Sequence, residues 1–234
     1  MKLPLAKDGC SVVAAGTIVL LGGAAAAVWG FHAGWPGFVI AAPLAAVWLW
    51  LVWFFRDPER PIPAATGLFV SSADGVVTDI TPLGADSELG VPGRRIGVFM
   101  NVLNVHVNRA PCDGVVADKR LTRGGREDVR RETAWHRNES VTLVLDYDPG
   151  DGRTMKVAMR QVAGMVARRI VCHPVVGEKL TRGQRIGMIR FGSRLELMLP
   201  DELNAEILVS PGQRVFAGSS VLARHGAGAA KAQT

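Results

Sequence analysis

Cysteine is scarce in this chain of 234 residues, and its three copies, Cys10, Cys112 and Cys172, stand far apart. An odd number without paired spacing provides neither a disulfide framework nor the clustered ligands of a zinc site. Isolated cysteines in apolar stretches are typical of small buried residues rather than nucleophiles. We therefore expect no metal and a compartment in which thiols stay reduced.

Charged residues are missing from two long runs near the N-terminus, Ser11 to Trp29 and Phe38 to Phe55. Each run has about 18–20 residues, which as a helix can cross the hydrocarbon core of a bilayer. Basic residues precede the first run and follow the second, so the positive-inside rule puts both ends in the cytoplasm. Residues 1–56 are therefore predicted to form a two-helix hairpin in the cell (inner) membrane, with spans at 11–29 and 38–55.

Two other interpretations of these runs stay open. The first run has the basic start of a cleaved signal peptide and small residues from Gly22 to Ala27, although it is long for one. Both runs could also be core helices of a soluble protein, but neither has a charged face. The sequence does not decide whether the hairpin spans the membrane or lies in it.

A long helical period is also missing after residue 57, apart from a weak one around Glu127 to Trp135. Short runs with β-branched residues alternate instead with Gly, Pro and Asp turns. This pattern predicts a mostly β domain over residues 57–225, and the small, polar tail 226–234 is predicted to be disordered. The strand candidates are Gly67–Val70, Gly75–Ile80, Arg95–Val102, Val141–Leu145, Lys156–Ala163 and Glu206–Val209.

Internal repeats refine this prediction. Asp74-Gly75-Val76-Val77 recurs as Asp113-Gly114-Val115-Val116, and the glycine turn 176–183 is echoed by 211–218. This rhythm resembles the flattened β-sandwich of lipoyl and biotinyl domains, with their hammerhead elements. Neither copy carries a modifiable lysine at its tip, so a carrier role is not expected. Glycine turns recur in many β proteins, which is the simpler explanation of the pattern.

Lysine is sparse in the β domain, and none of its copies lies in a glycine loop that could hold the phosphate of pyridoxal phosphate (PLP). A PLP-dependent activity is therefore not expected. Gly192-Ser193 offers another electrophile, because glycine permits the strained turn that brings Ser193 Oγ to the preceding carbonyl. Ester formation and elimination would cut the chain and leave a pyruvoyl group, which can condense with an amine as a Schiff base. Gly-Ser pairs usually form only turns, so the other residues must support this chemistry.

An amine decarboxylase also needs a proton donor and a group that activates or orients it. His106 is the best candidate, in a β-like run whose Asn104 and Arg109 could line a polar pocket. Asp74 lies before a tight glycine turn and could act as a base. Taken singly, a strand histidine is more often structural, and an aspartate before glycine is usually a turn residue.

Together these motifs resemble the phosphatidylserine decarboxylase proenzyme family in its short bacterial and archaeal form. The resemblance covers about residues 54–222 and the general character of the hairpin. The motifs follow in the family's order: Phe54-Phe55-Arg56-Asp57-Pro58, Ser72-Ala73-Asp74-Gly75, Asn104 to Pro111, Asn138-Glu139 and Arg190-Phe191-Gly192-Ser193-Arg194.

The resemblance implies self-cleavage between Gly192 and Ser193. The products would be a β chain from Met1 to Gly192 and an α chain that begins with the pyruvoyl cofactor at position 193. It also implies Asp74 and His106 as catalytic residues, with His106 serving decarboxylation. The substrate would be phosphatidylserine in a membrane and the product phosphatidylethanolamine. Homo-oligomers are left open.

The chain departs from longer family members at Arg109, which stands where they carry a second histidine that is thought to drive self-cleavage. Which residue activates Ser193 is therefore open, and we favour Asp74 with help from His106. Arg194 follows the cleavage site where the longer members tend to have threonine. Arg194, Arg109 and Asn104 are candidate substrate contacts, because arginine pairs well with phosphate and carboxylate.

The segment 119–137 is basic. Residues 119–137 hold seven Lys or Arg against three Asp or Glu, which suits anionic headgroups but equally a solvated loop. Without interleaved aromatic residues, this segment does not favour nucleic acid.

A non-enzymatic membrane-anchored adaptor would leave Asp74, His106 and Gly192-Ser193 without a role. A serine hydrolase would need the G-x-S-x-G elbow, which Phe191 to Leu195 lack.

Overall fold

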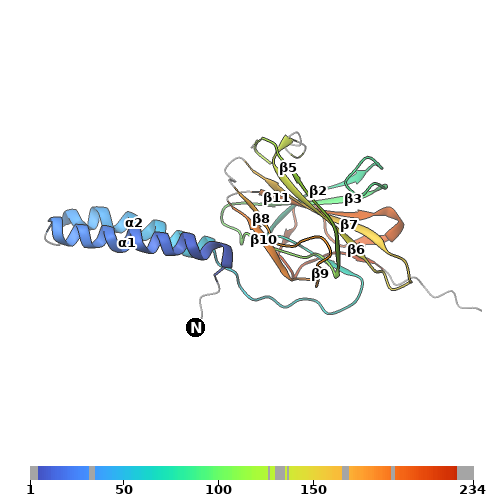
Figure 1. The fold of residues 1–234 in the computed structure, drawn as a ribbon, viewed down its shortest axis with the longest axis horizontal. Coiled ribbons are helices and arrows are strands. Elements are labelled where there is room, and N and C mark those ends of the chain that lie inside the picture. The colour runs from blue at the N-terminus through green and yellow to red at the C-terminus, as the bar shows by residue number, and fades with distance from the viewer. Residues whose placement is uncertain are drawn as a thin grey trace, which may run out of the picture. The chain divides into compact units, whose positions relative to one another are not determined.

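The computed structural model describes residues 5–31, 35–125, 127–129, 135, 137–164, 169–190 and 193–225. The chain divides into two compact units, Met1–Glu59 and Arg60–Thr234. The first unit is helical and the second consists mainly of strands (Figure 1). Each unit is described by itself.

The first unit contains a short 3-10 helix, Lys7–Gly9, followed by α1 (Cys10–Phe31) and α2 (Trp35–Phe54). The two helices contact each other, and Trp48 Nε1 of α2 donates a hydrogen bond of 2.9 Å to Thr17 Oγ1 of α1. Other apolar side chains point outward, such as Ile18, which is 72% exposed. Among the described residues, Lys7–Ala27 is long and apolar enough to cross a membrane, whereas the apolar helix Ala41–Phe54 is shorter.

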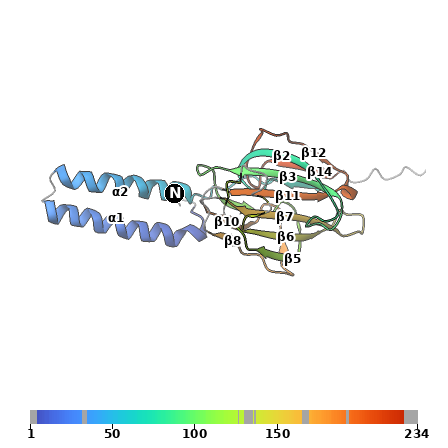
Figure 2. The ribbon, with the colours of Figure 1, turned by 90° about the horizontal axis from the view of Figure 1, so that it is seen from above.

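The second unit is mostly β, as the sequence predicts. Its largest sheet is open, curled and antiparallel, and Figure 2 shows its central strands side by side. Two three-stranded sheets and a 3-10 helix, Asp201–Leu203, complete the unit. The large sheet has the order β13 (Arg214–Val215), β2 (Gly75–Leu83), β3 (Gly93–Met100), β11 (Ser193–Pro200), β7 (Met155–Ala163), β6 (Ser140–Tyr147), β5 (Gly114–Thr122) and β9 (Lys179–Leu180). The small sheets are β1 (Leu68–Val70), β14 (Val221–His225), β12 (Ala205–Ile207), and β4 (Val107–Arg109), β10 (Arg185–Ile189), β8 (Ile170–Cys172).

The two faces of the large sheet differ because successive side chains of a strand point to opposite sides. One face carries the apolar core, to which Val98 of β3, Leu195 of β11 and Met159 of β7 contribute. The opposite face of the same three strands carries buried arginines: Arg95 of β3, Arg194 of β11 and Arg160 of β7. Strand β11 is buried over its whole length, so it separates an apolar layer from a charged one.

The two glycine turns found in the sequence have the same backbone geometry. Gly177 and Gly212 have φ angles of 88° and 90°, in the left-handed region that favours glycine. Their N–H groups donate to Val116 O and Val77 O, both at 2.8 Å. The turns lead into β9 and β13, which pair with the first residues of β5 and β2. The sequence repeat is therefore also a structural repeat.

Candidate active site

Ser193 is the first residue of β11, where it pairs with Met100 at the end of β3 and Ala163 at the end of β7. Its side chain is fully buried, and Oγ has no hydrogen-bond partner among the described residues. An unpartnered buried hydroxyl is costly, which is a feature typical of reactive sites. Gly192, the other half of the expected cleavage site, lies outside the described residues, as does the tail 226–234.

His106 follows β3 and immediately precedes β4, and it is fully buried. Its Nδ1 lies 2.9 Å from the backbone oxygen of Asn104. Because a carbonyl oxygen can only accept, the proton of the neutral ring is on Nδ1, and Nε2 is the basic nitrogen. The side chain of Asn104 is used within its own loop, where Oδ1 accepts a hydrogen bond of 2.9 Å from Asn101 N. Asn104 therefore orients the histidine through its backbone.

Asp74 lies in the loop between β1 and β2 and is 4% exposed. Its Oδ2 forms an ion pair of 2.7 Å with Arg60 Nη2, and its Oδ1 accepts a hydrogen bond of 2.8 Å from Ala217 N. Since β2 and β11 both neighbour β3, the first residues of these strands lie about 10 Å apart at the same end of the sheet. Asp74 and Ser193 thus lie at the same end of the large sheet, without a direct hydrogen bond between them.

Arg109 is buried in β4. Its Nη1 donates to Gly183 O at 3.2 Å, and its side chain packs beside Gly218. Alternation along the extended chain puts His106 and Asn108 on one face of β4 and Arg109 on the other. Arg109 therefore packs against the two glycine turns.

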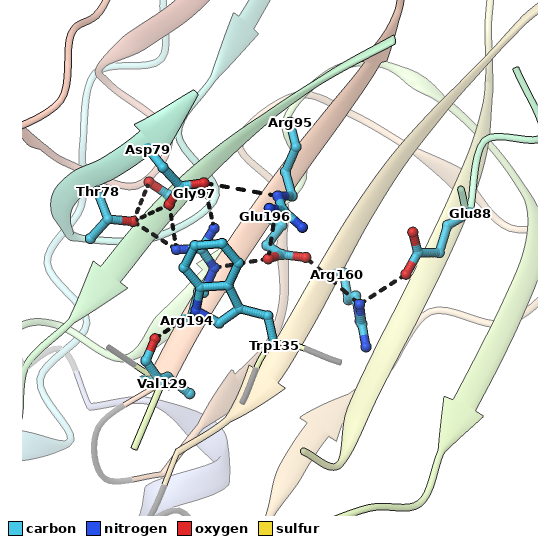
Figure 3. A network of polar contacts seen from close by, with 10 residues as sticks. All are labelled: Thr78, Asp79, Glu88, Arg95, Gly97, Val129, Trp135, Arg160, Arg194 and Glu196. Carbon is cyan, nitrogen blue, oxygen red and sulfur yellow. Dashed lines mark hydrogen bonds and ion pairs between the residues drawn. The ribbon is translucent and has the colours of Figure 1, made fainter. Parts of the chain in front are cut away.

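The surroundings of Arg194 differ from those expected for a substrate contact. Its guanidinium group donates to both oxygens of Asp79, at 2.6 and 2.9 Å, and to Glu196 Oε1 at 2.8 Å (Figure 3). The central carbon of its guanidinium group, Cζ, lies 3.7 Å from the centre of the Trp135 ring. Because Arg194 directly follows Ser193 in a strand, the two side chains point to opposite faces. The hydrogen-bond partners of Arg194 among the described residues lie on the charged face, away from Ser193 Oγ.

The charged face also depends on a glycine. A Cβ atom at Gly97 would collide with the guanidinium group of Arg194, so glycine leaves room for that group in its observed position. Burial alone would raise the pKa of Asp79, but the hydrogen bond and charge of Arg194 overcome it and lower the pKa below its usual value. The charged face therefore carries an ionised network, which packs on the side of β11 opposite the apolar core.

Three buried polar residues are not among the site residues predicted from the sequence: Ser72, Asn108 and Gln161. Gln161 Nε2 donates a hydrogen bond of 2.8 Å to Asn108 Oδ1. Gln161 Oε1 and Ser72 Oγ are buried without a hydrogen-bond partner among the described residues. One signal was available, since Gln161 interrupts the apolar positions of the strand Lys156–Ala163. Its link to Asn108 depends on the tertiary structure.

The cysteines of the β unit are not arranged as nucleophiles. Burial raises the pKa of the Cys112 thiol well above its usual value and that of Cys172 to about 11. Thiols with raised pKa values are poor nucleophiles, since the thiolate is the reactive form. Within the part of the chain that the structure describes, no group of three or more His, Cys, Asp or Glu residues could hold a metal ion.

The chain is similar to known proteins over most of its length. The family model for phosphatidylserine decarboxylase matches residues 48–223, a range that includes Asp74, His106 and Ser193. A phosphatidylserine decarboxylase proenzyme from Geobacter sulfurreducens is 41% identical over 220 residues, which are 94% of this chain and 95% of the relative. Proteins of the same name from Trichlorobacter lovleyi and Ruegeria pomeroyi are both 45% identical, over 80% and 75% of this chain and 82% and 78% of their own.

Proposed function

The chain belongs to the phosphatidylserine decarboxylase family, and on this premise we propose that it converts phosphatidylserine to phosphatidylethanolamine. The reaction removes the carboxylate of the serine headgroup as carbon dioxide. The membership does not favour the adaptor, and no G-x-S-x-G elbow surrounds Ser193 to favour a hydrolase.

The observation that carries the proposed chemistry is the buried Oγ of Ser193, which has no hydrogen-bond partner within the described part of the chain. We propose that this oxygen attacks the carbonyl carbon of Gly192, which turns the amide into an ester. Elimination then releases Gly192 as a carboxylate, and water removes the nitrogen of residue 193 as ammonia. The pyruvoyl carbonyl left at position 193 would condense with the serine amine and accept the electrons that remain when carbon dioxide leaves.

Asp74 and His106 are the proposed acid–base groups. Asp74 is held in place by Arg60 and Ala217 N, so its carboxylate has a defined position at the Ser193 end of the sheet. His106 is oriented through Nδ1, which leaves Nε2 as the nitrogen that can take and return a proton. We assign the activation of Ser193 to Asp74 with help from His106, and the delivery of the proton to Cα to His106.

We further propose that the first unit anchors the enzyme as a hairpin in the cell membrane, with the β unit on the cytoplasmic side. The outward-facing apolar residues of α1 support this, because water would solvate them poorly. The matched glycine turns likewise support a lipoyl-like arrangement of the β unit. The two chains made by cleavage would stay together, because β11 pairs along its length with strands of the larger chain.

Intact mass spectrometry of the purified full-length protein tests the proposal. We expect two chains, the smaller beginning with pyruvoyl in place of Ser193, and release of carbon dioxide from phosphatidylserine in detergent micelles. Ser193→Ala should remain a single inactive chain. A fully active Ser193→Ala protein, or an active wild-type chain that stays uncut, would contradict the proposed function.

A further inference from the structure

The buried amide pair of Gln161 and Asn108 has a fixed hydrogen-bond direction. Asn108 Nδ2 lies 3.5 Å from the backbone oxygen of Ser72, an atom that can only accept. Asn108 must therefore turn Oδ1 toward Gln161, and Gln161 Nε2 donates a hydrogen bond of 2.8 Å to this oxygen. The backbone oxygen of Val171, 3.5 Å from Nε2, favours the same orientation. Gln161 Oε1 is consequently the atom that remains available.

Gln161 Oε1 is an acceptor in a place where an unpartnered polar atom is costly. The residue is 1% exposed, and Oε1 has no hydrogen-bond partner within the described ranges. A buried carbonyl oxygen without a partner destabilises a protein, so such an atom calls for a functional explanation. A ligand with an N–H or O–H group would complete the network that begins at Ser72.

The strand register brings this acceptor to the reacting residue. Gln161 pairs with Leu195 and Ala163 pairs with Ser193, so Gln161 and Ser193 are diagonal neighbours on one face of the sheet. Diagonal neighbours have Cβ atoms about 7 Å apart, which a glutamine side chain can span. A group that reacts at position 193 therefore comes within reach of Gln161 Oε1.

We propose that Gln161 is a substrate-binding residue whose Oε1 accepts a hydrogen bond from the amino group of the serine headgroup. This inference rests on the proposed function. Of the charged groups of the headgroup, the phosphate and the carboxylate can only accept at neutral pH, whereas the ammonium group can only donate. The direction of the amide pair thus selects the amine, the group that must meet residue 193. Asn108 is the positioning residue that keeps Gln161 in this orientation.

The test compares variants of the full-length, self-cleaved enzyme by isothermal titration calorimetry. The two probes are glycerophosphoethanolamine and glycerol 3-phosphate, which lacks the amine. We expect the wild type to prefer the amine-bearing probe and Gln161→Met to lose this preference by about 10-fold or more, since a charge-assisted hydrogen bond disappears. The kcat/KM per pyruvoyl group should fall about 10- to 100-fold. Gln161→Glu keeps an acceptor oxygen in either protonation state and should retain the preference.

Gln213→Met is the matched control, because Gln213 is exposed in a turn, where its Oε1 accepts a hydrogen bond from Ser210 N. It should behave as the wild type does. A Gln161→Met enzyme that keeps its preference for the amine would overturn the inference, as would a folded variant that stays uncut, since Gln161 would then serve self-cleavage. If Gln161→Met does not fold, loss of the preference in Gln161→Glu overturns it. A wild-type chain without pyruvoyl would instead remove the proposed function, and the inference with it.

Discussion

The loops that contain Asp74 and Asp113 form matching hydrogen bonds but have different surroundings. In each, the aspartate Oδ1 accepts a hydrogen bond from the residue before the last glycine of the partner turn: Ala217 N at 2.8 Å and Arg182 N at 3.0 Å. In each, the following strand has a bulge after its second valine, at Val77 and Val116. The β unit therefore builds one motif twice.

The two copies lie at opposite ends of the large sheet. Asp74 precedes β2 at the end where Ser193 begins β11, whereas Asp113 precedes β5 at the end where β6 passes into β7. Asp74 is buried and paired with Arg60, but Asp113 is exposed. A motif that could be structural in both places becomes a candidate site at the end of the sheet where Ser193 begins β11 and where Arg60 pairs with the aspartate.

The largest difference between the copies should appear when each aspartate loses its charge. Asp74→Asn keeps an oxygen for Ala217 N but cannot accept a proton as a carboxylate or pair with Arg60. We expect self-cleavage, and any decarboxylation that depends on it, to fall about 100-fold or more, as when an acid–base group is removed. Asp113→Asn should leave both rates unchanged. Gel analysis of cleavage and assays of carbon dioxide release give the result, and equal losses in the two variants would refute the assignment.

The second comparison concerns the aspartates that follow the bulges, Asp79 and Asp118. Asp79 pairs with Arg194, whose side chain is 1% exposed, whereas Asp118 pairs with Arg120 at the surface. Asp79→Asn should lower the free energy of unfolding by about 3–5 kcal/mol, because it leaves a buried arginine short of a partner. Asp118→Asn should cause no measurable change. Urea denaturation in detergent measures both, and a stable Asp79→Asn protein would show that the network contributes little.

The same pair predicts a dependence of stability on pH. Because the pKa of Asp79 is lower in the folded protein than in the unfolded chain, its charge stabilises the fold above the usual aspartate pKa of about 4. This contribution is lost as the pH falls through the folded pKa. The difference in stability between wild type and Asp79→Asn should therefore shrink below pH about 4. A difference that stays constant down to pH about 2 would argue against an ionised Asp79.

The smallest effect tests the symmetry itself. Gly177 and Gly212 have matching positive φ angles, and an added Cβ would meet nothing within 4 Å at either position. Alanine should then cost about 1 kcal/mol at each site through backbone strain alone. Thermal unfolding of Gly177→Ala and Gly212→Ala should give equal shifts, while unequal shifts would mean that the two turns differ in the strain they bear.

Much of this protein follows from local features of the chain. The order of the motifs was sufficient to indicate the family, because it can be read without knowing any contact. The mostly β character follows from short β-branched runs between turns, and the repeats follow from glycines at matching intervals. Even the strand bounds are close: Lys156–Ala163 was expected and β7 is Met155–Ala163. The strand expected at Glu206–Val209 ends earlier, since β12 is Ala205–Ile207. Beyond the end of this strand, Leu208 N still donates a hydrogen bond to Leu222 O.

What the sequence by itself determined, then, is the family, the class of fold and the serine at which the chemistry is proposed. Only the tertiary structure decided that Arg194 lies on the charged face of the sheet, that Asp74 rather than Asp113 is buried with a charged partner, and that Gln161 meets Asn108. A strand's alternation shows that neighbours point to opposite sides, but not which side becomes the core. That choice depends on pairing between distant segments, as with Gln161 and Asn108, which are 53 residues apart.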